Sequence, residues 1–219
     1  MQTILTPNPD IGNPPTSDKS AYDTAGNVQI NSVLGAEWKP STSEDSEAAR
    51  TTSELAYEIA ASREMDRIKA EGGNPYFIPS GASLHPLGGL GFARFAFELQ
   101  KQEEDLGVRF DAIVVACASG STLGGMMAGF KLIEKTGTST RDLNKRRLIG
   151  IQATSCDLSE TSRVVMQSAK NTTKLIGLQE NDVGEEHFEL IGKFNGGSYG
   201  YLNEETKQAI KSLATTEGM

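Results

Sequence analysis

Short apolar runs recur along the second half of the chain at intervals that suit a parallel sheet. Residues 111–118 (DAIVVACA) form a nearly continuous apolar run, and residues 148–153 and 188–191 form two further short ones. Continuous apolar runs of this length are typical of parallel strands that are buried on both faces. The pattern therefore predicts three strands in this half of the chain.

Helices are predicted between and after these strands, where apolar residues recur at helical spacing. They cover residues 92–104, 123–135 and 159–178, and Asn203 followed by two glutamates predicts the start of a last helix. Strands that alternate with helices indicate βαβ units, so we predict an α/β fold with three layers and a mostly parallel sheet. The second of these helices carries small residues that would let it pack close to the sheet, namely Gly124, Gly125, Ala128 and Gly129.

The first part of the chain has a weaker pattern. A helix over residues 22–34 and a long helix over residues 44–70 are predicted from their apolar positions, each followed by glycine. Short strands are expected at residues 3–6, around Trp38 and at residues 76–78. This part therefore reads as a smaller α/β region.

Composition limits the function classes. The 219 residues include 21 Lys and Arg against 29 Asp and Glu, giving a net charge of −8. An acidic chain without a basic cluster is a poor candidate for binding nucleic acid or an anionic membrane surface. No apolar stretch is long enough to span a membrane, and no signal peptide is recognised, so we expect a cytoplasmic protein. Two cysteines, Cys117 and Cys156, form neither a disulfide framework nor a metal-binding pattern, so no metal site is expected.

The segment with the clearest chemistry follows the first predicted strand of the sheet. Ala118, Ser119, Gly120, Ser121 and Thr122 connect that strand to the next helix. Unpaired amides at a helix N-terminus attract anions, small residues allow close approach, and the hydroxyls add donors. Ligands of open α/β sheets bind at this end of the strands. A phosphate-binding turn is one interpretation, and the other is a turn whose hydroxyls merely cap the helix.

The common phosphate motifs do not explain this turn. No Gly-Lys-Ser/Thr follows it, so it is not a Walker loop, and its glycine spacing differs from the dinucleotide fingerprint. A second glycine-rich stretch begins like that fingerprint at Gly89 but carries Arg94 at the third glycine position. The ligand class therefore depends on longer motifs.

Two longer motifs are similar to those of the 1-aminocyclopropane-1-carboxylate (ACC) deaminases. They are residues 78–93 (IPSGASLHPLGGLGFA) and residues 120–126 (GSTLGGM). Shorter similarities occur in the same order along the chain, at residues 22–30, 147–151, 198–200 and 216–219. Together they cover nearly the whole chain, which resembles an ACC deaminase truncated at both ends.

The resemblance implies a fold and an activity. The family belongs to the tryptophan-synthase-β-like class of pyridoxal phosphate (PLP) enzymes, called fold type II, whose members are typically homodimers. It implies cleavage of the small amino acid ACC to 2-oxobutanoate and ammonia, with PLP as cofactor. It also implies that residues 1–82 are the remainder of a small mobile domain and residues 83–219 part of a large PLP-binding domain.

The resemblance also implies roles for particular residues. The turn from Ala118 to Thr122 would hold the cofactor phosphate, and Tyr199 would lie near the substrate as a catalytic tyrosine. The family usually has an aspartate where this chain has Leu84, and His85 is expected to be structural. The entrance between the domains would be lined by Ser80, Gly81, Ala82 and Ser83.

Several alternatives stay open at this point. PLP chemistry needs a lysine amine, and the resemblance implies that this lysine, a Ser-Asn pair and a Tyr-Glu pair lie in segments outside this chain. The chain could therefore be a non-catalytic homologue or pseudoenzyme that binds phosphate or PLP only. A D-cysteine desulfhydrase-like lyase and a phosphosugar or nucleotide binder are further alternatives. We also expect exposed sheet edges, a marginal fold and a tendency to aggregate.

Overall fold

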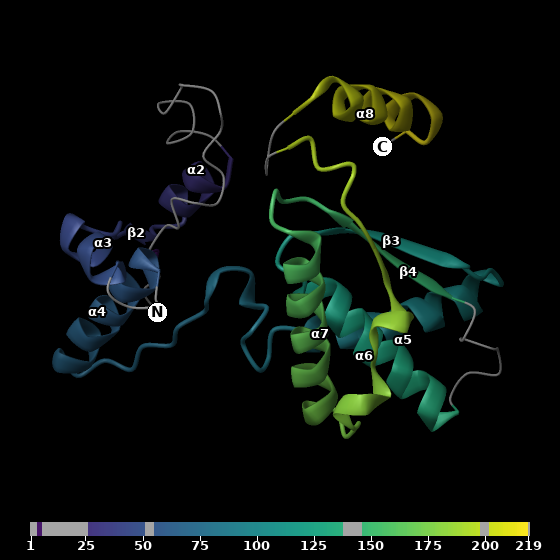
Figure 1. The fold of residues 1–219 in the computed structure, drawn as a ribbon, viewed down its shortest axis with the longest axis horizontal. Coiled ribbons are helices and arrows are strands. Elements are labelled where there is room, and N and C mark those ends of the chain that lie inside the picture. The colour runs from purple at the N-terminus through teal and green to yellow at the C-terminus, as the bar shows by residue number, and fades with distance from the viewer. Residues whose placement is uncertain (1–3, 6–25, 51–54, 138–145, 198–201, 219) are drawn as a thin grey trace. The chain divides into compact units, whose positions relative to one another are not determined.

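The computed structural model of the chain describes residues 4–5, 26–50, 55–137, 146–197 and 202–218. It divides into two compact units, Met1–Pro79 and Ser80–Met219, each of which is described by itself (Figure 1). The boundary follows Pro79, whereas the sequence predicted a domain boundary after Ala82. That these units are the small and large domains of a PLP enzyme stays a prediction.

The described residues of the first unit form a small parallel sheet and three helices. Strand β1 (Ile4–Leu5) pairs with β2 (Glu37–Trp38), as expected from the short apolar segments there. Helix α2 (Gly26–Val33) is followed by Gly35, which adopts the left-handed conformation (φ +76°) that ends helices. Both strands and this helix confirm predictions from the sequence.

Two predictions for this unit are wrong. The expected long helix is two helices, α3 (Ser43–Ala49) and α4 (Ala56–Ala70), and Leu55 before α4 is extended (φ −83°, ψ 148°). Hydroxyl-bearing and β-branched residues separate the two apolar stretches, and such residues favour caps over helix interiors. The strand predicted at residues 76–78 is absent from the structure, and Tyr76 and Ile78 are 67% and 72% exposed.

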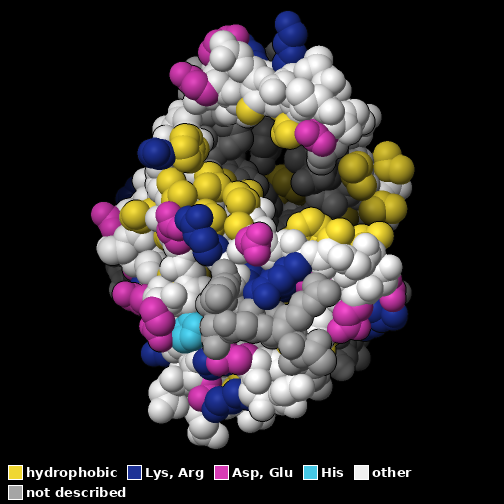
Figure 2. Space-filling view, turned by 90° about the vertical axis from the view of Figure 1, so that its right-hand side faces the viewer, with side chains coloured by type: hydrophobic (Ala, Val, Ile, Leu, Met, Phe, Trp, Pro, Cys, Tyr) yellow, Lys and Arg dark blue, Asp and Glu magenta, His cyan; other side chains and the backbone are white. Residues whose placement is uncertain are grey.

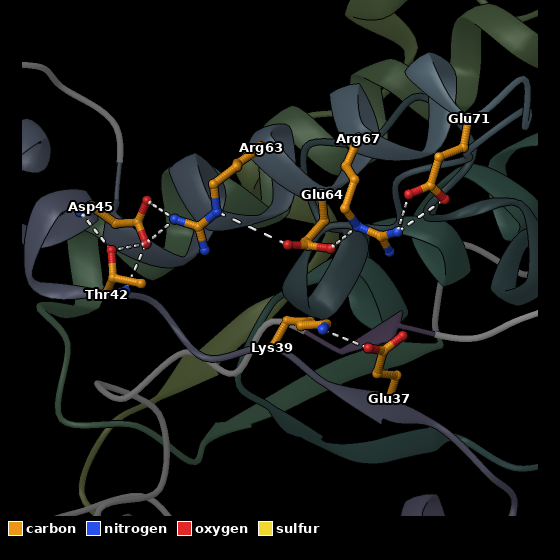
Figure 3. Close-up of polar contacts among 8 residues, drawn as sticks. All are labelled: Glu37, Lys39, Thr42, Asp45, Arg63, Glu64, Arg67 and Glu71. Atoms are coloured by element: carbon orange, nitrogen blue, oxygen red, sulfur yellow. Dashed lines mark hydrogen bonds and ion pairs between the residues drawn. The ribbon is translucent and has the colours of Figure 1, made fainter.

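A chain of polar contacts joins α3 to α4 (Figure 3). The Asp45 carboxylate accepts hydrogen bonds from the Thr42 amide (2.6 Å) and from Arg63 Nη1 (2.5 and 2.6 Å), and this side chain is buried. Arg67 donates to Glu64 (2.9 Å) one turn along α4. Burial raises the pKa of Asp45, but the Thr42 amide and Arg63 outweigh burial and hold that pKa below its ordinary value. The carboxylate therefore stabilises this unit in its charged form.

The second unit is built on a three-stranded parallel sheet. Its strands are β3 (Ala112–Cys117), β4 (Arg147–Gln152) and β5 (Glu189–Ile191), in the order β3-β4-β5. Val115 is opposite Gly150, and Gly150 is opposite Leu190. All three strands occur where the apolar runs predicted them.

Three helices pack on one face of this sheet (Figure 1): α5 (Leu90–Leu106), α6 (Ser121–Thr136) and α7 (Leu158–Leu175). Ile113 and Val115 point toward these helices, while Val114, on the other face of β3, is 63% exposed. The core formed between sheet and helices contains Cys117, Leu123, Met126, Met127, Leu148, Val165, Ala169 and Val183.

Short 3₁₀ turns and a final helix complete the second unit. The 3₁₀ turns are Ser80–Ala82, Glu180–Asp182 and Glu185–His187. Helix α8 (Glu204–Thr216) is capped as predicted by Asn203, whose side chain accepts from the Thr206 amide (2.8 Å), and the helix residues are exposed. The predicted parallel α/β class is confirmed, and a third layer on the exposed sheet face stays a prediction.

The small residues of α6 pack against helices, which corrects the expectation that they face the sheet. A Cβ built on Gly124 would lie 2.7 Å from the Val165 carbonyl oxygen of α7. A Cβ on Gly129 would lie 2.3 Å from the Ala93 carbonyl oxygen of α5. The sequence predicted that α6 packs closely on a neighbouring element. It did not show that the neighbours are α5 and α7, because small residues lie on both sides of α6.

A buried ion pair connects α5 to the start of β4. Arg146 Nη2 donates to both Glu103 oxygens (2.7 and 2.6 Å), and the two side chains are 3% and 8% exposed. Glu103 also accepts from the Phe110 amide (2.8 Å), and the Arg146 guanidinium lies 4.8 Å from the Phe130 ring centroid. Glu103 therefore holds both Phe110, which lies shortly before β3, and Arg146, the residue that precedes β4.

The surface of this unit carries charges of both signs. Figure 2 shows hydrophobic side chains gathered on one face, with Lys and Arg interspersed among Asp and Glu. In the part of the chain that the structure describes, no helix combines the length and apolar character needed to cross a bilayer.

Candidate functional site

The predicted phosphate-binding turn lies at the carboxyl end of β3. Gly120 is buried with φ +82°, which an L side chain rarely adopts, and a Cβ there would lie 2.9 Å from Val165 Cγ2. Ala118 is exposed and Ser119 is half-buried. A glycine is therefore required for the tight passage from β3 into α6.

The start of α6 leaves amide donors without helical acceptors. The first helical hydrogen bond runs from the Gly124 amide to the Gly120 carbonyl (2.9 Å), and in the described part of the chain no side chain caps the helix. The amides of Ser121, Thr122 and Leu123 therefore have no acceptor within the helix. Among the described residues, no hydroxyl of this turn accepts a hydrogen bond from these amides, so the capping interpretation has no support in the structure.

The helix terminus adds an electrostatic preference to these donors. The aligned peptide dipoles of α6 place a partial positive charge of about half an elementary charge at this end. The half-buried Thr122 and Ser119 side chains lie beside the amides and carry further hydroxyl donors. The arrangement suits a small anion with several acceptor oxygens.

The loop of residues 80–83 lies directly against this turn, a contact that the sequence did not predict. Ser83 Oγ donates a short hydrogen bond to the Ser119 carbonyl, and Ser121 Oγ donates to the Gly81 carbonyl (3.0 Å). Ser83 and Ser121 are each 8% exposed. The two predicted groups, the phosphate turn and the loop, are thus brought together within one unit. That the loop also lines an entrance between domains stays a prediction.

The backbone of this loop is unusual. Gly81 has φ +66°, and a Cβ there would lie 2.3 Å from Ser119 Cβ. Ala82 has φ +49°, a left-handed conformation that costs a residue other than glycine about 1 kcal/mol or more. A Cβ on Gly88 would lie 1.9 Å from the Ala82 carbonyl oxygen. Small residues are therefore required for the loop to approach the turn.

The thiol next to the turn is not a reactive group. Cys117 is 2% exposed, and burial raises the pKa of its thiol, with a hydrogen bond from the Gly120 amide offsetting part of the rise. A neutral buried thiol is a poor nucleophile. The amides that follow Gly120 at the start of α6 are the donors open to a ligand.

The remaining residues named in the sequence analysis make local contacts, are exposed or lie outside the described residues. His85 Nδ1 accepts from the Leu87 amide (3.2 Å), a local turn contact in keeping with the structural role expected for it. Leu84 is 57% exposed, and Ser80 is exposed. Tyr199, the predicted catalytic tyrosine, lies outside the described residues.

A cavity of about 470 Å³ lies at the opposite end of the sheet, where Arg147 begins β4. Its cations are paired: Lys131 with Glu134 (3.0 Å) and Arg147 with Glu189 (2.7 Å). Over the residues that can be described, no three His, Cys, Asp or Glu side chains gather to hold a metal ion. The uncapped α6 terminus is therefore the better candidate for anion binding.

Comparison with known proteins gives a consistent result. Residues 16–219 match the sequence profile of the family described as "Pyridoxal-phosphate dependent enzyme". Several curated relatives carry the name 1-aminocyclopropane-1-carboxylate deaminase. Those from Methylobacterium nodulans and Bradyrhizobium diazoefficiens are 36% and 37% identical over 202 residues, which is 92% of this chain and 54% of each relative. That from Mesorhizobium japonicum is 38% identical over 199 residues, or 90% of this chain and 53% of the relative. The chain thus spans about half the length of the curated relatives it matches.

Proposed function

Because the chain belongs to the pyridoxal-phosphate dependent enzyme family, we propose that its 118–122 turn holds the phosphate of PLP and that the protein serves ACC deamination. The matched relatives are named for ACC rather than D-cysteine, which favours the deaminase over the desulfhydrase. The observation that carries the proposal is the uncapped start of α6 after a left-handed Gly120.

The residues of the turn fit a phosphate group. Three amides without helical acceptors and the hydroxyls of Ser119 and Thr122 offer donors to the three outer oxygens of a phosphomonoester. A Cβ at position 120 would collide with Val165, so the glycine keeps the turn tight against α7. The positive end of the α6 dipole favours the dianion.

The cofactor and this chain would divide the work. PLP, when bound, supplies an electron sink for breaking bonds next to an amino group. The turn anchors the phosphate end and so sets the position of the ring. Tyr199 is proposed to lie near the substrate, where its hydroxyl could hold or move a proton.

None of Lys39, Lys131 and Lys135 is placed to be the lysine that the chemistry requires. Lys131 and Lys135 pair with Glu134 and Asp182, both at the far end of α6 from the turn. Lys39 pairs with Glu37 in the first unit. We therefore propose that the amine comes from a segment other than these, as the resemblance implies.

Binding of PLP by the purified chain tests the phosphate site. We expect PLP to bind more tightly than pyridoxal, which lacks the phosphate, and inorganic phosphate to compete with PLP. Gly120→Ala should abolish this preference, because alanine is strained at φ +82° and collides with Val165. Gly91→Ala is the matched control, since a Cβ at Gly91 meets no atom within 4 Å. Equal binding of PLP and pyridoxal by the wild-type chain would contradict the proposal.

The activity and its setting need separate assays. Supplying ACC and PLP should yield 2-oxobutanoate and ammonia, while pyruvate and sulfide from D-cysteine would favour the desulfhydrase.

A homodimer in the cytoplasm is proposed from the family resemblance. Sedimentation of the purified protein would reveal a monomer if the dimer is wrong.

A further inference from the structure

Two crossed hydrogen bonds join the 80–83 loop to the 118–122 turn. Ser83 donates to the Ser119 carbonyl, and Ser121 donates back to the Gly81 carbonyl (3.0 Å). The partners are 36 and 40 residues apart, so neither bond is a local turn contact. Each segment therefore holds the other in place.

The first bond controls a carbonyl that would repel an anion. The negative end of the Ser119 peptide group lies next to the amides that begin α6. Because its oxygen accepts from the buried Ser83 hydroxyl, that negative charge is directed to the loop and partly neutralised. The orientation of this carbonyl is thus fixed by the loop.

The second bond removes a donor that the sequence had assigned to the phosphate. A serine hydroxyl carries one proton, and that of Ser121 is donated to the Gly81 carbonyl. The buried Ser121 side chain therefore cannot also donate to a phosphate while this bond is kept. The hydroxyls of Ser119 and Thr122 make no hydrogen bond to the described residues, so they are the hydroxyls of the turn that a phosphate could use.

We propose that Ser83 and Ser121 are positioning residues that hold the 80–83 loop on the turn, whereas Ser119, Thr122 and the first amides of α6 bind the phosphate. This inference rests on the proposed function. The loop supports it, because Gly81 allows contact with Ser119 and Ala82 keeps a strained conformation that the surrounding contacts must maintain.

Hydrogen exchange together with PLP binding separates the two roles. In Ser83→Ala and Ser121→Ala, we expect faster amide exchange in residues 80–83 and about fivefold weaker PLP binding, which corresponds to about 1 kcal/mol. In Ser119→Ala and Thr122→Val, we expect weaker PLP binding with unchanged exchange in the loop. Ser121→Thr keeps a hydroxyl and should restore both properties.

A control and the contrary results complete the test. Ser46→Ala removes a hydroxyl that donates to a backbone carbonyl within one helix (3.1 Å), and it should change neither property. Unchanged exchange in Ser83→Ala and Ser121→Ala overturns the positioning role. Weaker binding in Ser121→Ala with unchanged loop exchange would instead make Ser121 a phosphate ligand. If the wild-type chain does not prefer PLP to pyridoxal, the proposed function fails, and loop exchange alone then decides the positioning role.

Discussion

Removing the Glu103 carboxylate should destabilise the second unit more than any exposed substitution. Glu103 is the counter-charge of Arg146, whose side chain is 3% exposed. In Glu103→Ala the guanidinium would lose two hydrogen bonds of 2.7 and 2.6 Å, and its Nη1 has no hydrogen-bond partner among the residues that the structure describes. The Phe110 amide would lose its acceptor too.

The magnitude follows from this burial. Leaving one member of a buried ion pair without its partner typically costs 3–5 kcal/mol, and we expect about 4 kcal/mol here. Glu103→Gln keeps an acceptor but loses the charge, so about 2 kcal/mol is expected. The double variant Glu103→Leu, Arg146→Met removes both charges and should recover most of the loss, since apolar replacements of such pairs are often neutral.

Urea denaturation followed by two signals measures this loss within the second unit. Far-ultraviolet circular dichroism reports both units, whereas fluorescence of Trp38, the single tryptophan, reports the first. The circular dichroism transition should move to lower urea in Glu103→Ala while the Trp38 transition stays in place. Glu104→Ala, at the exposed neighbouring position, should shift neither by more than about 0.5 kcal/mol. A loss below about 1 kcal/mol in Glu103→Ala would show that Arg146 does not depend on this carboxylate.

Three further predictions concern packing, pH and thiol reactivity. Gly129→Ala should lower the free energy of unfolding in urea by about 1–3 kcal/mol, because its Cβ would lie 2.3 Å from a backbone oxygen of α5. Gly91→Ala should be neutral or stabilising, and equal effects of the two substitutions would contradict the packing. The pKa of Asp45 is lowered in the folded state, so its charged form contributes stability above about pH 4, and this stability is lost as the pH falls through the folded-state pKa. Asp45→Asn should therefore lower the free energy of unfolding followed by Trp38 fluorescence by about 1–2 kcal/mol at pH 7 and flatten its dependence on acid. An unchanged acid dependence would contradict this. A thiol reagent should modify exposed Cys156 rapidly and buried Cys117 only on unfolding, as peptide mapping would show; rapid labelling of Cys117 would contradict its burial.

Much of the second unit could be predicted because its signals are local. The run around Val115 and the capping by Asn203 depend on neighbouring residues, and the structure places β3 and α8 accordingly. The passage from β3 into α6 was likewise evident, since Gly120 follows a buried strand and precedes a helical pattern.

What the sequence did not predict depends on distant contacts. The bond between Ser83 and Ser119 joins positions 36 residues apart, and no periodicity encodes that pairing. The extended Leu55 divides a stretch whose apolar spacing looked continuous. Gly124 signalled close packing, but only the three-dimensional arrangement shows that α7 is its partner.

Amide chemical shifts during titration with inorganic phosphate test most directly whether the first amides of α6 bind a phosphate group. The largest shifts should occur at Ser121, Thr122 and Leu123, and Gly120→Ala should abolish them. Shifts confined to other parts of the chain, such as the cavity near Arg147, would show that the phosphate binds elsewhere.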